Sequence, residues 1–281
     1  MGDCQKSGCG GGSAQQIQQK QEESVQQALA NIKQKFLVMS GKGGVGKTSV
    51  SVNLAMALAD RGFKVGIMDV DVHGPDVPRM LGLSGVMATG NGDKLSPLRY
   101  SDNLTAISIE GIMPDRDAAV IWRGPLKHSA IKQFIGDVDW GMLDFLIVDS
   151  PPGTGDEPMS VAQMIPDAKA VVVTTPQEVA LSDVRKSINF CKKMGMEIFG
   201  VVENMSGYAC PHCGETIDPF GTGGGEKTAA QFGLRFLGRI PFDPNLVKAG
   251  DAGDAFQTVY KDSPVTKAFG AIADQAAGVL T

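Results

Sequence analysis

Short apolar runs alternate with segments of helical spacing over most of the chain, from Phe36 to about Pro241. Several runs are apolar almost throughout, such as 145–148 (FLIV) and 170–173 (AVVV), which is typical of strands buried on both faces. This alternation predicts right-handed βαβ units, and therefore a mostly parallel sheet with helices on both faces, a three-layer α/β/α fold. The expected strands are 36–40, 65–69, 144–149, 170–175 and 198–204, with a weaker one at 236–239.

The limits of this regular pattern also indicate how the chain is divided into a tail and a domain. Residues 1–24 are rich in Gly, Gln and Ser, so we expect a flexible tail there. Residues 25–281 are expected to form one domain, in which 25–35 adds a short helix before the first strand. The stretch 84–125 is rich in Gly, Pro and Ser and predicts an insertion of less regular structure.

Composition narrows the classes of partner. The 281 residues are 42% hydrophobic and 20% charged, which is typical of a soluble globular protein with a sizeable core. The net charge of −5 argues against nonspecific binding of nucleic acid, which needs an accumulated basic surface. No apolar run approaches the ~20 residues of a membrane span, and the N-terminus lacks a signal-peptide core. We therefore expect a cytoplasmic protein without a membrane partner, whose five cysteines are reduced thiols or metal ligands.

Residues 41–48 read GKGGVGKT and match the phosphate-binding pattern G-x-x-x-x-G-K-S/T. An apolar strand precedes them and helical spacing follows, so the phosphates would lie at a helix N-terminus. Backbone N–H groups of the loop would surround the phosphate oxygens, while Lys47 supplies a positive charge and Thr48 a ligand for Mg²⁺. The residues expected to bind ATP here are Gly41, Lys42, Gly43, Gly44, Val45, Gly46, Lys47, Thr48 and Ser49.

Lys42 is the unusual member of this loop, because Lys47 already supplies a cation to the same phosphates. The pattern KGGVGKT resembles the deviant Walker A loop of a dimerising class that includes the MinD/ParA proteins, the nitrogenase iron protein and the Mrp/ApbC scaffolds. This resemblance implies that Lys42 reaches across a dimer interface to the partner's nucleotide and takes part in catalysis with Lys47. The alternative is a solvated lysine at a loop tip.

Acidic residues follow two of the expected strands. Asp69 ends the strand 65–69 and Asp71 follows two residues later, a spacing that points both side chains the same way, towards Mg²⁺ or the attacking water. Asp149 ends the run FLIVD, which has the Walker B form, in which the acid holds Mg²⁺. The turn SPPGTGD (150–156) comes next and is able to sense a γ-phosphate. An isolated Asp is more often a helix cap, but the class resemblance implies that Asp71 orients the water.

Asn204 ends the strand 198–204, where a side-chain amide offers the donor and acceptor needed to read the adenine edge. Spacing alone equally allows a turn-forming asparagine. The class resemblance favours base recognition.

Cys210 and Cys213 form a C-x-x-C pair within YACPHCG (208–214). A redox pair of the thioredoxin type should open a helix, but the next periodic segment starts only near Gly224. A zinc knuckle within one chain would need a second nearby pair. A two-fold axis would turn this pair into four thiolates, enough for a [4Fe–4S] cluster or a zinc ion between subunits, and thiolates alone do not distinguish the two. His212 is expected to be exposed or locally bonded.

Further motifs accompany the phosphate loop and the cysteine pair. They are DVD at 69–71, GP at 74–75, MLG at 80–82, PPGTGD at 151–156, TTPQEVAL at 174–181, NMS at 204–206 and GRIP at 238–241. Together they resemble the Mrp/ApbC-type iron–sulfur cluster carriers over residues 36 to about 281. The resemblance implies a homodimer that binds a labile [4Fe–4S] cluster through Cys210 and Cys213 of each subunit. It also implies transfer of the cluster to apo iron–sulfur proteins, coupled to slow ATP hydrolysis.

The tail differs from the family's extended members, which carry a four-cysteine N-terminal motif. It contains only Cys4 and Cys9, and two thiolates cannot complete a stable cluster site within one subunit. We therefore expect an accessory role or none for these two cysteines. Cys191 lies at helical spacing and is expected to be a core residue.

The alternative function is a MinD/ParA-like positioning ATPase with a structural zinc ion at the dimer interface. Such a protein would need a basic amphipathic helix or a basic face. Residues 268–281 contain one acid and no base, which disfavours this alternative. An electron-donating reductase like the nitrogenase iron protein is a further rival, but its cluster cysteines are far apart in sequence.

Overall fold

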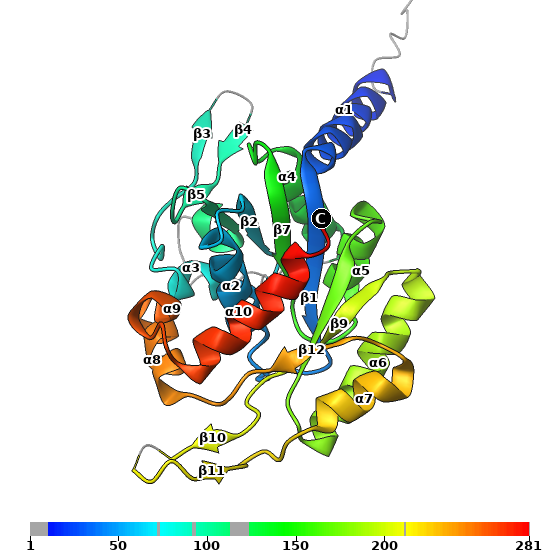
Figure 1. Ribbon diagram of the computed structural model, residues 1–281. Helices are drawn as coiled ribbons and strands as arrows, with labels where there is room; N and C mark the ends of the chain where they lie inside the picture. The colour runs from blue at the N-terminus through cyan, green and yellow to red at the C-terminus, as the bar shows by residue number, and fades with distance from the viewer. Residues whose placement is uncertain (1–10, 72–73, 92–93, 113–123, 211, 281) are drawn as a thin grey trace, which may run out of the picture.

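The computed structural model describes residues 11–71, 74–91, 94–112, 124–210 and 212–280. An eight-stranded sheet lies at its centre, and all neighbouring strands are parallel except the short edge strand β5, which is antiparallel to β6 (Figure 1). In spatial order the strands are β12 (Phe236–Arg239), β9 (Ile198–Glu203), β8 (Lys169–Thr174), β1 (Ile32–Ser40), β7 (Leu143–Asp149), β2 (Val65–Asp69), β6 (Leu104–Ser108) and β5 (Leu98–Arg99).

Helices cover both faces of the sheet. Consecutive side chains of a strand point to opposite sides, so a central strand contributes to the hydrophobic core on each face. In β1, Phe36 and Val38 join the hydrophobic core on one face, and Leu37 and Met39 join the core on the other. The first core includes residues of α2 (Lys47–Ala59), α3 (Val77–Met80), α8 (Pro244–Ala252), α9 (Phe256–Val259) and α10 (Pro264–Ala277). The second includes residues of α1 (Gly11–Ala30), α4 (Gly124–Gly136), α5 (Asp156–Met164), α6 (Glu178–Met194) and α7 (Gly224–Phe232).

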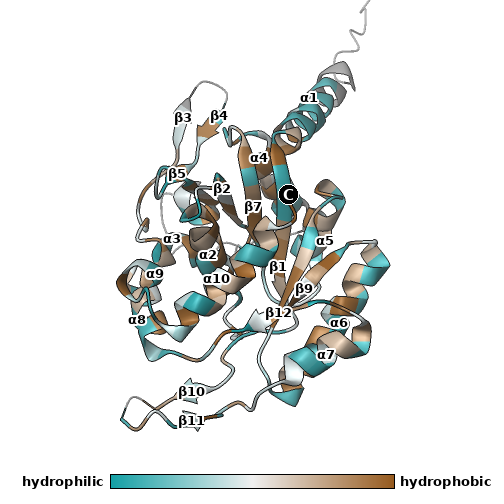
Figure 2. Cartoon of the chain, in the orientation of Figure 1, coloured by the Kyte–Doolittle hydropathy of each residue, from teal (hydrophilic) through white to brown (hydrophobic). Residues whose placement is uncertain are grey.

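Hydropathy along the chain follows these layers. The central strands β1 and β7 are mostly hydrophobic, whereas much of α1 is hydrophilic (Figure 2). Residues 145–148 of β7 are fully buried, as expected for a strand that is covered on both faces. The predicted three-layer α/β/α fold with a mostly parallel sheet is confirmed.

The parallel register brings the carboxyl ends of three central strands to one edge of the sheet. Asp69 at the end of β2 lies opposite Asp149 at the end of β7. Asp149 in turn lies opposite Val38, two residues before the end of β1. Ligands of open α/β sheets bind in the crevice at this edge, so the register places the predicted nucleotide residues in one region.

Helix α1 differs from the expected flexible tail, since it begins at Gly11. Its Gln, Glu, Lys and Ala residues favour helix, and Gln18 and Gln19 donate hydrogen bonds to Glu22 and Glu23 one turn later. Helical backbone therefore replaces the expected flexible backbone over residues 11–24.

The C-terminal part of α1 packs on α4. Val25 is buried there, and Ser24 Oγ donates to the carbonyl oxygen of Gly136 at 2.7 Å. The expected helix over 25–35 ends at Ala30, because β1 begins at Ile32 and not at Phe36. Residues 1–10 with Cys4 and Cys9 lie outside the described residues, and the division into a tail and one domain stays a prediction.

The stretch 84–125 is more regular than expected. It contributes β6, which pairs with β2 along its whole length, the edge strand β5, and a hairpin of β3 (Thr89–Asn91) and β4 (Lys94–Ser96). A 3₁₀ helix follows at Ile109–Ile112, and residues 113–123 lie outside the described residues. Strand β6 escaped prediction because its sequence, LTAIS, mixes polar and apolar residues over only five positions.

Among the residues that the structure describes, no helix is both long enough and apolar enough to cross a membrane.

Substitution of Gly200 in β9 tests how closely the chain packs near the β12 edge of the sheet. An added Cβ would lie 2.6 Å from Leu237 Cγ and 2.8 Å from the carbonyl oxygen of Arg235. We expect Gly200→Ala to lower the free energy of unfolding by about 1–3 kcal/mol, measured by urea denaturation. Gly90→Ala in β3 is the control, because no atom lies within 4 Å of its added Cβ. Equal losses in the two variants would contradict the packing described.

Candidate functional site

The phosphate loop, residues 41–46, connects β1 to α2. Gly46 precedes the first turn of α2 with a left-handed backbone, φ 77°, a conformation that favours glycine. Gly41 packs on the backbone of α6, where an added Cβ would lie 2.3 Å from the carbonyl carbon of Asp183. The loop therefore lies at a helix N-terminus, as predicted for a phosphate site, and packs closely on α6 at Gly41.

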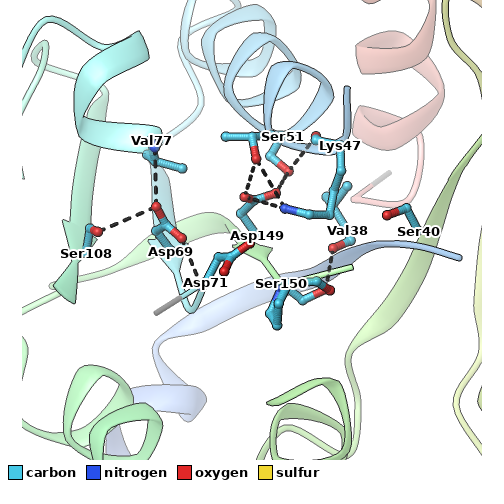
Figure 3. A network of polar contacts seen from close by, with 12 residues as sticks. Val38, Ser40, Lys47, Ser51, Asp69, Asp71, Val77, Ser108, Asp149 and Ser150 are labelled. Carbon is cyan, nitrogen blue, oxygen red and sulfur yellow. Dashed lines mark hydrogen bonds and ion pairs between the residues drawn. The ribbon is translucent and has the colours of Figure 1, made fainter. Parts of the chain in front are cut away.

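Asp149 is the centre of a buried polar network beneath this loop (Figure 3). Its Oδ2 lies 2.7 Å from Lys47 Nζ and accepts a hydrogen bond from Thr48 Oγ1 at 2.8 Å. Its Oδ1 accepts one from Ser51 Oγ at 2.5 Å. The side chains of Lys47 and Asp149 are only 7% and 1% exposed, so each charge depends on the other for compensation.

The donor set around Asp149 fits a magnesium site, because hydroxyl and carboxylate oxygens are hard ligands of the kind that Mg²⁺ prefers. Lys47 Nζ also donates to Thr48 Oγ1 at 3.2 Å, so the three groups predicted from the loop and the Walker B strand come together. Ser51 was missed by the sequence analysis. The only signal for it is its position one helical turn after Lys47, on the same face of α2.

Asp69 supports the loop that carries Asp71. Its carboxylate is fully buried and accepts hydrogen bonds from the backbone N–H groups of Asp71, at 3.0 Å, and Val77, at 3.2 Å. Burial, and then the neighbouring charge of Asp149, raise the pKa of Asp69 well above its usual value. Both oxygens are thus engaged with the chain, and direct contact of Asp69 with Mg²⁺ stays a prediction.

A cavity of about 400 Å³ lies beside the phosphate loop. Lys42, Lys47, Thr48 and Asp71 all line it, so the structure brings these predicted residues to one site. Helices α3 and α8 also line the cavity, a role that was not predicted for them from the sequence. Their lining residues include Arg79, Met80, Leu246, Val247 and Gly250.

Asn204 contacts the phosphate loop directly. Its Nδ2 donates to the carbonyl oxygen of Val45 at 2.9 Å, and the residue is 4% exposed. A Cβ added at Gly46 would lie 2.2 Å from the same Nδ2. The amide thus supports the loop from the end of β9, a role that spacing did not indicate, and its reading of the adenine edge stays a prediction.

The cysteine pair lies on a hairpin of β10 (Tyr208–Ala209) and β11 (Thr216–Ile217), which extends from the body at the lower left of Figure 1. Cys210 is half-buried and Cys213 is exposed. The backbone N–H groups of His212 and then of Cys213, followed by the Cys213 side chain, lower the pKa of the Cys210 thiol. This favours the thiolate, which is the form that binds metals.

Within the described ranges, no three His, Cys, Asp or Glu side chains come together as a metal site. His212 is exposed, which is one of the two environments expected for it, and Pro211 lies outside the described residues. One chain therefore offers two thiolates from this hairpin, half of a four-thiolate site.

Cys191 in α6 has a different environment. Its side chain is fully buried, its Sγ lies 3.3 Å from Met39 Sδ, and burial raises the pKa of its thiol to about 12. The predicted core position of Cys191 is confirmed.

Comparison with known proteins agrees with this geometry. The ParA family model, described as "NUBPL iron-transfer P-loop NTPase", matches residues 31–277. A curated relative from Saccharolobus solfataricus, named "Iron-sulfur cluster carrier protein", is 51% identical over 252 residues, which are 89% of this chain and 85% of the relative.

Two solved structures share the fold. A nucleotide-binding protein from Archaeoglobus fulgidus in complex with ADP is 35% identical, with a TM-score of 0.75, and the match covers 88% of this chain and 95% of that one. The cell division ATPase MinD of Pyrococcus furiosus is 26% identical, with a TM-score of 0.62, and the match covers 88% and 99%. The resemblances stated from the sequence, to the cluster carriers and more distantly to MinD, are confirmed.

Two glycines of the loop test the contact with Asn204. Gly44 and Gly46 both have φ 77°, but only at Gly46 would an added Cβ meet another atom within 4 Å. We expect Gly46→Ala to destabilise the fold by about 1–3 kcal/mol more than Gly44→Ala, measured by urea denaturation. Equal destabilisation would mean that the left-handed backbone, and not the asparagine, restricts this position.

Proposed function

Because this chain belongs to the family of NUBPL-type iron-transfer P-loop NTPases, we propose that it is an ATP-dependent iron–sulfur cluster carrier. It binds a labile [4Fe–4S] cluster as cargo between two copies of the chain and delivers it to apo iron–sulfur proteins. One observation carries this proposal. Two accessible thiols, Cys210 and Cys213, lie on a hairpin that extends from a P-loop NTPase body, without a third ligand among the described residues.

The dimer follows from the number of ligands. A [4Fe–4S] cluster needs four thiolates, so two hairpins related by a two-fold axis would complete one site. Tetrathiolate ligation also suits zinc, but the name of the relative at 51% identity favours iron–sulfur cargo. The exposure of Cys213 favours a cluster that can leave, because a recipient's thiols can approach it.

ATP would bind over the phosphate loop with Mg²⁺ held by Thr48 and Asp149, whose oxygens lie 2.8 Å apart. The ion would neutralise charge on the phosphates. Lys47 would exchange its contact with Asp149 for a phosphate oxygen, which keeps its buried charge compensated. The similar protein from Archaeoglobus fulgidus is in complex with ADP, which supports nucleotide binding by this chain.

Hydrolysis would use residues that line the same cavity. Asp71 would orient the attacking water, and Lys42 would contact the γ-phosphate bound to the partner subunit. Loss of that phosphate would relax the segments near Asp71 and 153–156 and separate the subunits. The distance between the paired hairpins would then change, and with it the affinity for the cluster.

A MinD/ParA-like positioning ATPase with structural zinc is not favoured. The MinD structure is 26% identical to this chain, whereas the relative named as a cluster carrier is 51% identical. We accordingly propose a cytoplasmic site of action, without a membrane or nucleic-acid partner.

Anaerobic reconstitution with iron and sulfide tests the cargo. We expect a broad absorption band near ~400 nm and about four irons per dimer, both lost in a Cys210→Ala/Cys213→Ala variant. A Cys4→Ser/Cys9→Ser variant is the matched control and should keep the iron. Tightly bound zinc in place of iron would make the site structural.

Replacement of Lys47 tests the coupling of ATP to transfer. Lys47→Ala removes the buried cation of the phosphate loop, so we expect ATP hydrolysis to fall about 100-fold or more and cluster transfer to an apo-protein to slow with it. Lys33→Ala is the control, because its ion pair with Asp144 is on the surface. A Lys47→Ala variant that transfers clusters as fast as the wild type would refute the coupling.

A further inference from the structure

A short segment, 203–207, joins the end of β9 to the cysteine hairpin, and we call it the connecting turn. It begins at a strand end beside the phosphate loop and ends at Gly207, next to the first residue of β10. The same few residues therefore connect the nucleotide site to the cysteine pair. Apart from the predicted reading of the adenine edge by Asn204, no function proposed so far uses this turn.

The first end of the turn is attached to the phosphate loop. Asn204 donates through Nδ2 to the carbonyl oxygen of Val45, while its own N–H donates to Thr174 of β8 at 2.7 Å. Met205 Cε lies 3.5 Å from the position that a Cβ would take at Gly46. Two consecutive side chains of the turn thus pack on the loop where it enters α2.

Met205 has a strained backbone. Among the described residues it alone, apart from glycines, has a positive φ, 55°. A residue with a Cβ keeps this conformation only where its surroundings hold it. On one side Asn204 is bonded to the loop, and on the other the N–H of Ser206 donates to the carbonyl oxygen of Ile240 at 3.0 Å. The strained conformation of Met205 therefore depends on the phosphate loop on one side and on the hydrogen bond to Ile240 on the other.

The second end of the turn, at Ser206, is bonded to the carboxylate of Glu203, which also accepts hydrogen bonds from the chain that follows the hairpin. Glu203 is fully buried, and its Oε1 accepts from Ser206 Oγ at 2.5 Å, just before the hairpin. Ser206 Oγ also lies 3.1 Å from Thr222 Oγ1, just after the hairpin. The backbone N–H groups of Gly223, at 2.8 Å, and Gly225, at 2.5 Å, donate to the same carboxylate at the start of α7.

We propose that the connecting turn transmits the state of the phosphate loop to the cysteine pair. Asn204, which contacts the loop, and Glu203, which accepts hydrogen bonds from both sides of the hairpin, are its positioning residues. Hydrogen bonds and peptide bonds link the Val45 carbonyl to the base of the hairpin without a gap. A nucleotide that moves the loop at Val45 and Gly46 alters the surroundings that hold Met205, and so shifts the hairpin base. This route is separate from Asp71 and 153–156, which follow β2 and β7. The inference rests on the proposed function only in its last step, where the position of the cysteines sets cluster affinity.

The test measures how fast an aromatic disulfide reagent modifies Cys210 and Cys213 in the metal-free full chain. Cys4→Ser/Cys9→Ser replacements remove the tail thiols, and Cys191 is shielded by burial. Rates are compared without nucleotide and with Mg²⁺ and a non-hydrolysable ATP analogue. We expect the nucleotide to change the rate by at least about fivefold, the lower end of a typical coupling between sites.

Ser206→Ala breaks the link without touching the proposed nucleotide or cluster ligands. We expect it to reduce the nucleotide effect to within about twofold, while the affinity for the analogue, measured by calorimetry, stays that of the wild type. Glu203→Gln is a second variant and should act in the same direction, because it places an amide nitrogen against a backbone N–H. Ser187→Ala is the matched control, since its buried hydroxyl has no hydrogen-bond partner within the described chain, and it should keep the full effect.

An unchanged nucleotide effect in Ser206→Ala would overturn the proposal, and so would a wild type whose thiol reactivity ignores the nucleotide. In that second case reconstitution of the wild type with iron still decides the carrier function on its own. Conversely, a hairpin that responds to nucleotide but binds no iron would support the link and refute the carrier function.

Discussion

The buried contact between Lys47 and Asp149 is the interaction on which the rest of the nucleotide site depends. It joins the first residue of α2 to the last residue of β7 at 2.7 Å, almost out of contact with water. Either charge alone at this depth would be costly, so each keeps the other in place. Thr48 and Ser51 complete the coordination of the carboxylate. The same groups suit phosphate and Mg²⁺. We infer that nucleotide binding replaces some of the contacts among these side chains, which already stabilise the fold, by contacts with phosphate and Mg²⁺.

The second constraint is that one cysteine hairpin offers only two thiolates. A cluster with four iron sites requires a second copy, and this links cargo binding to association of the chains. Lys42 lines the nucleotide cavity and is proposed to reach the partner's nucleotide, so ATP and cargo would both favour the dimer. The connecting turn gives the two events a physical connection within each chain. Carrier function is therefore proposed as a property of the pair of chains, which depends on contacts that lie within each chain.

Local motifs made much of this site predictable. The phosphate loop, Asp149 and the cysteine pair are recognisable because their chemistry needs particular residues at short spacing, and the parallel register then brings Asp69 and Asp149 to one edge. The support of the loop by Asn204 was not predictable, because it joins residues far apart in the sequence. Ser51 and the contribution of α8 to the cavity wall escaped for the same reason. Strand β6 and the first part of α1 were missed because short mixed strands and polar helices lack a clear apolar period.

Native mass spectrometry of the anaerobically reconstituted protein tests the central claim most directly, because it reads the oligomeric state and the bound metal in one spectrum. We expect a dimer that carries the mass of one [4Fe–4S] cluster, and a chain without bound metal for the Cys210→Ala/Cys213→Ala variant. Monomers that each hold iron, or a dimer that holds zinc at this position, would contradict a subunit-bridging cluster.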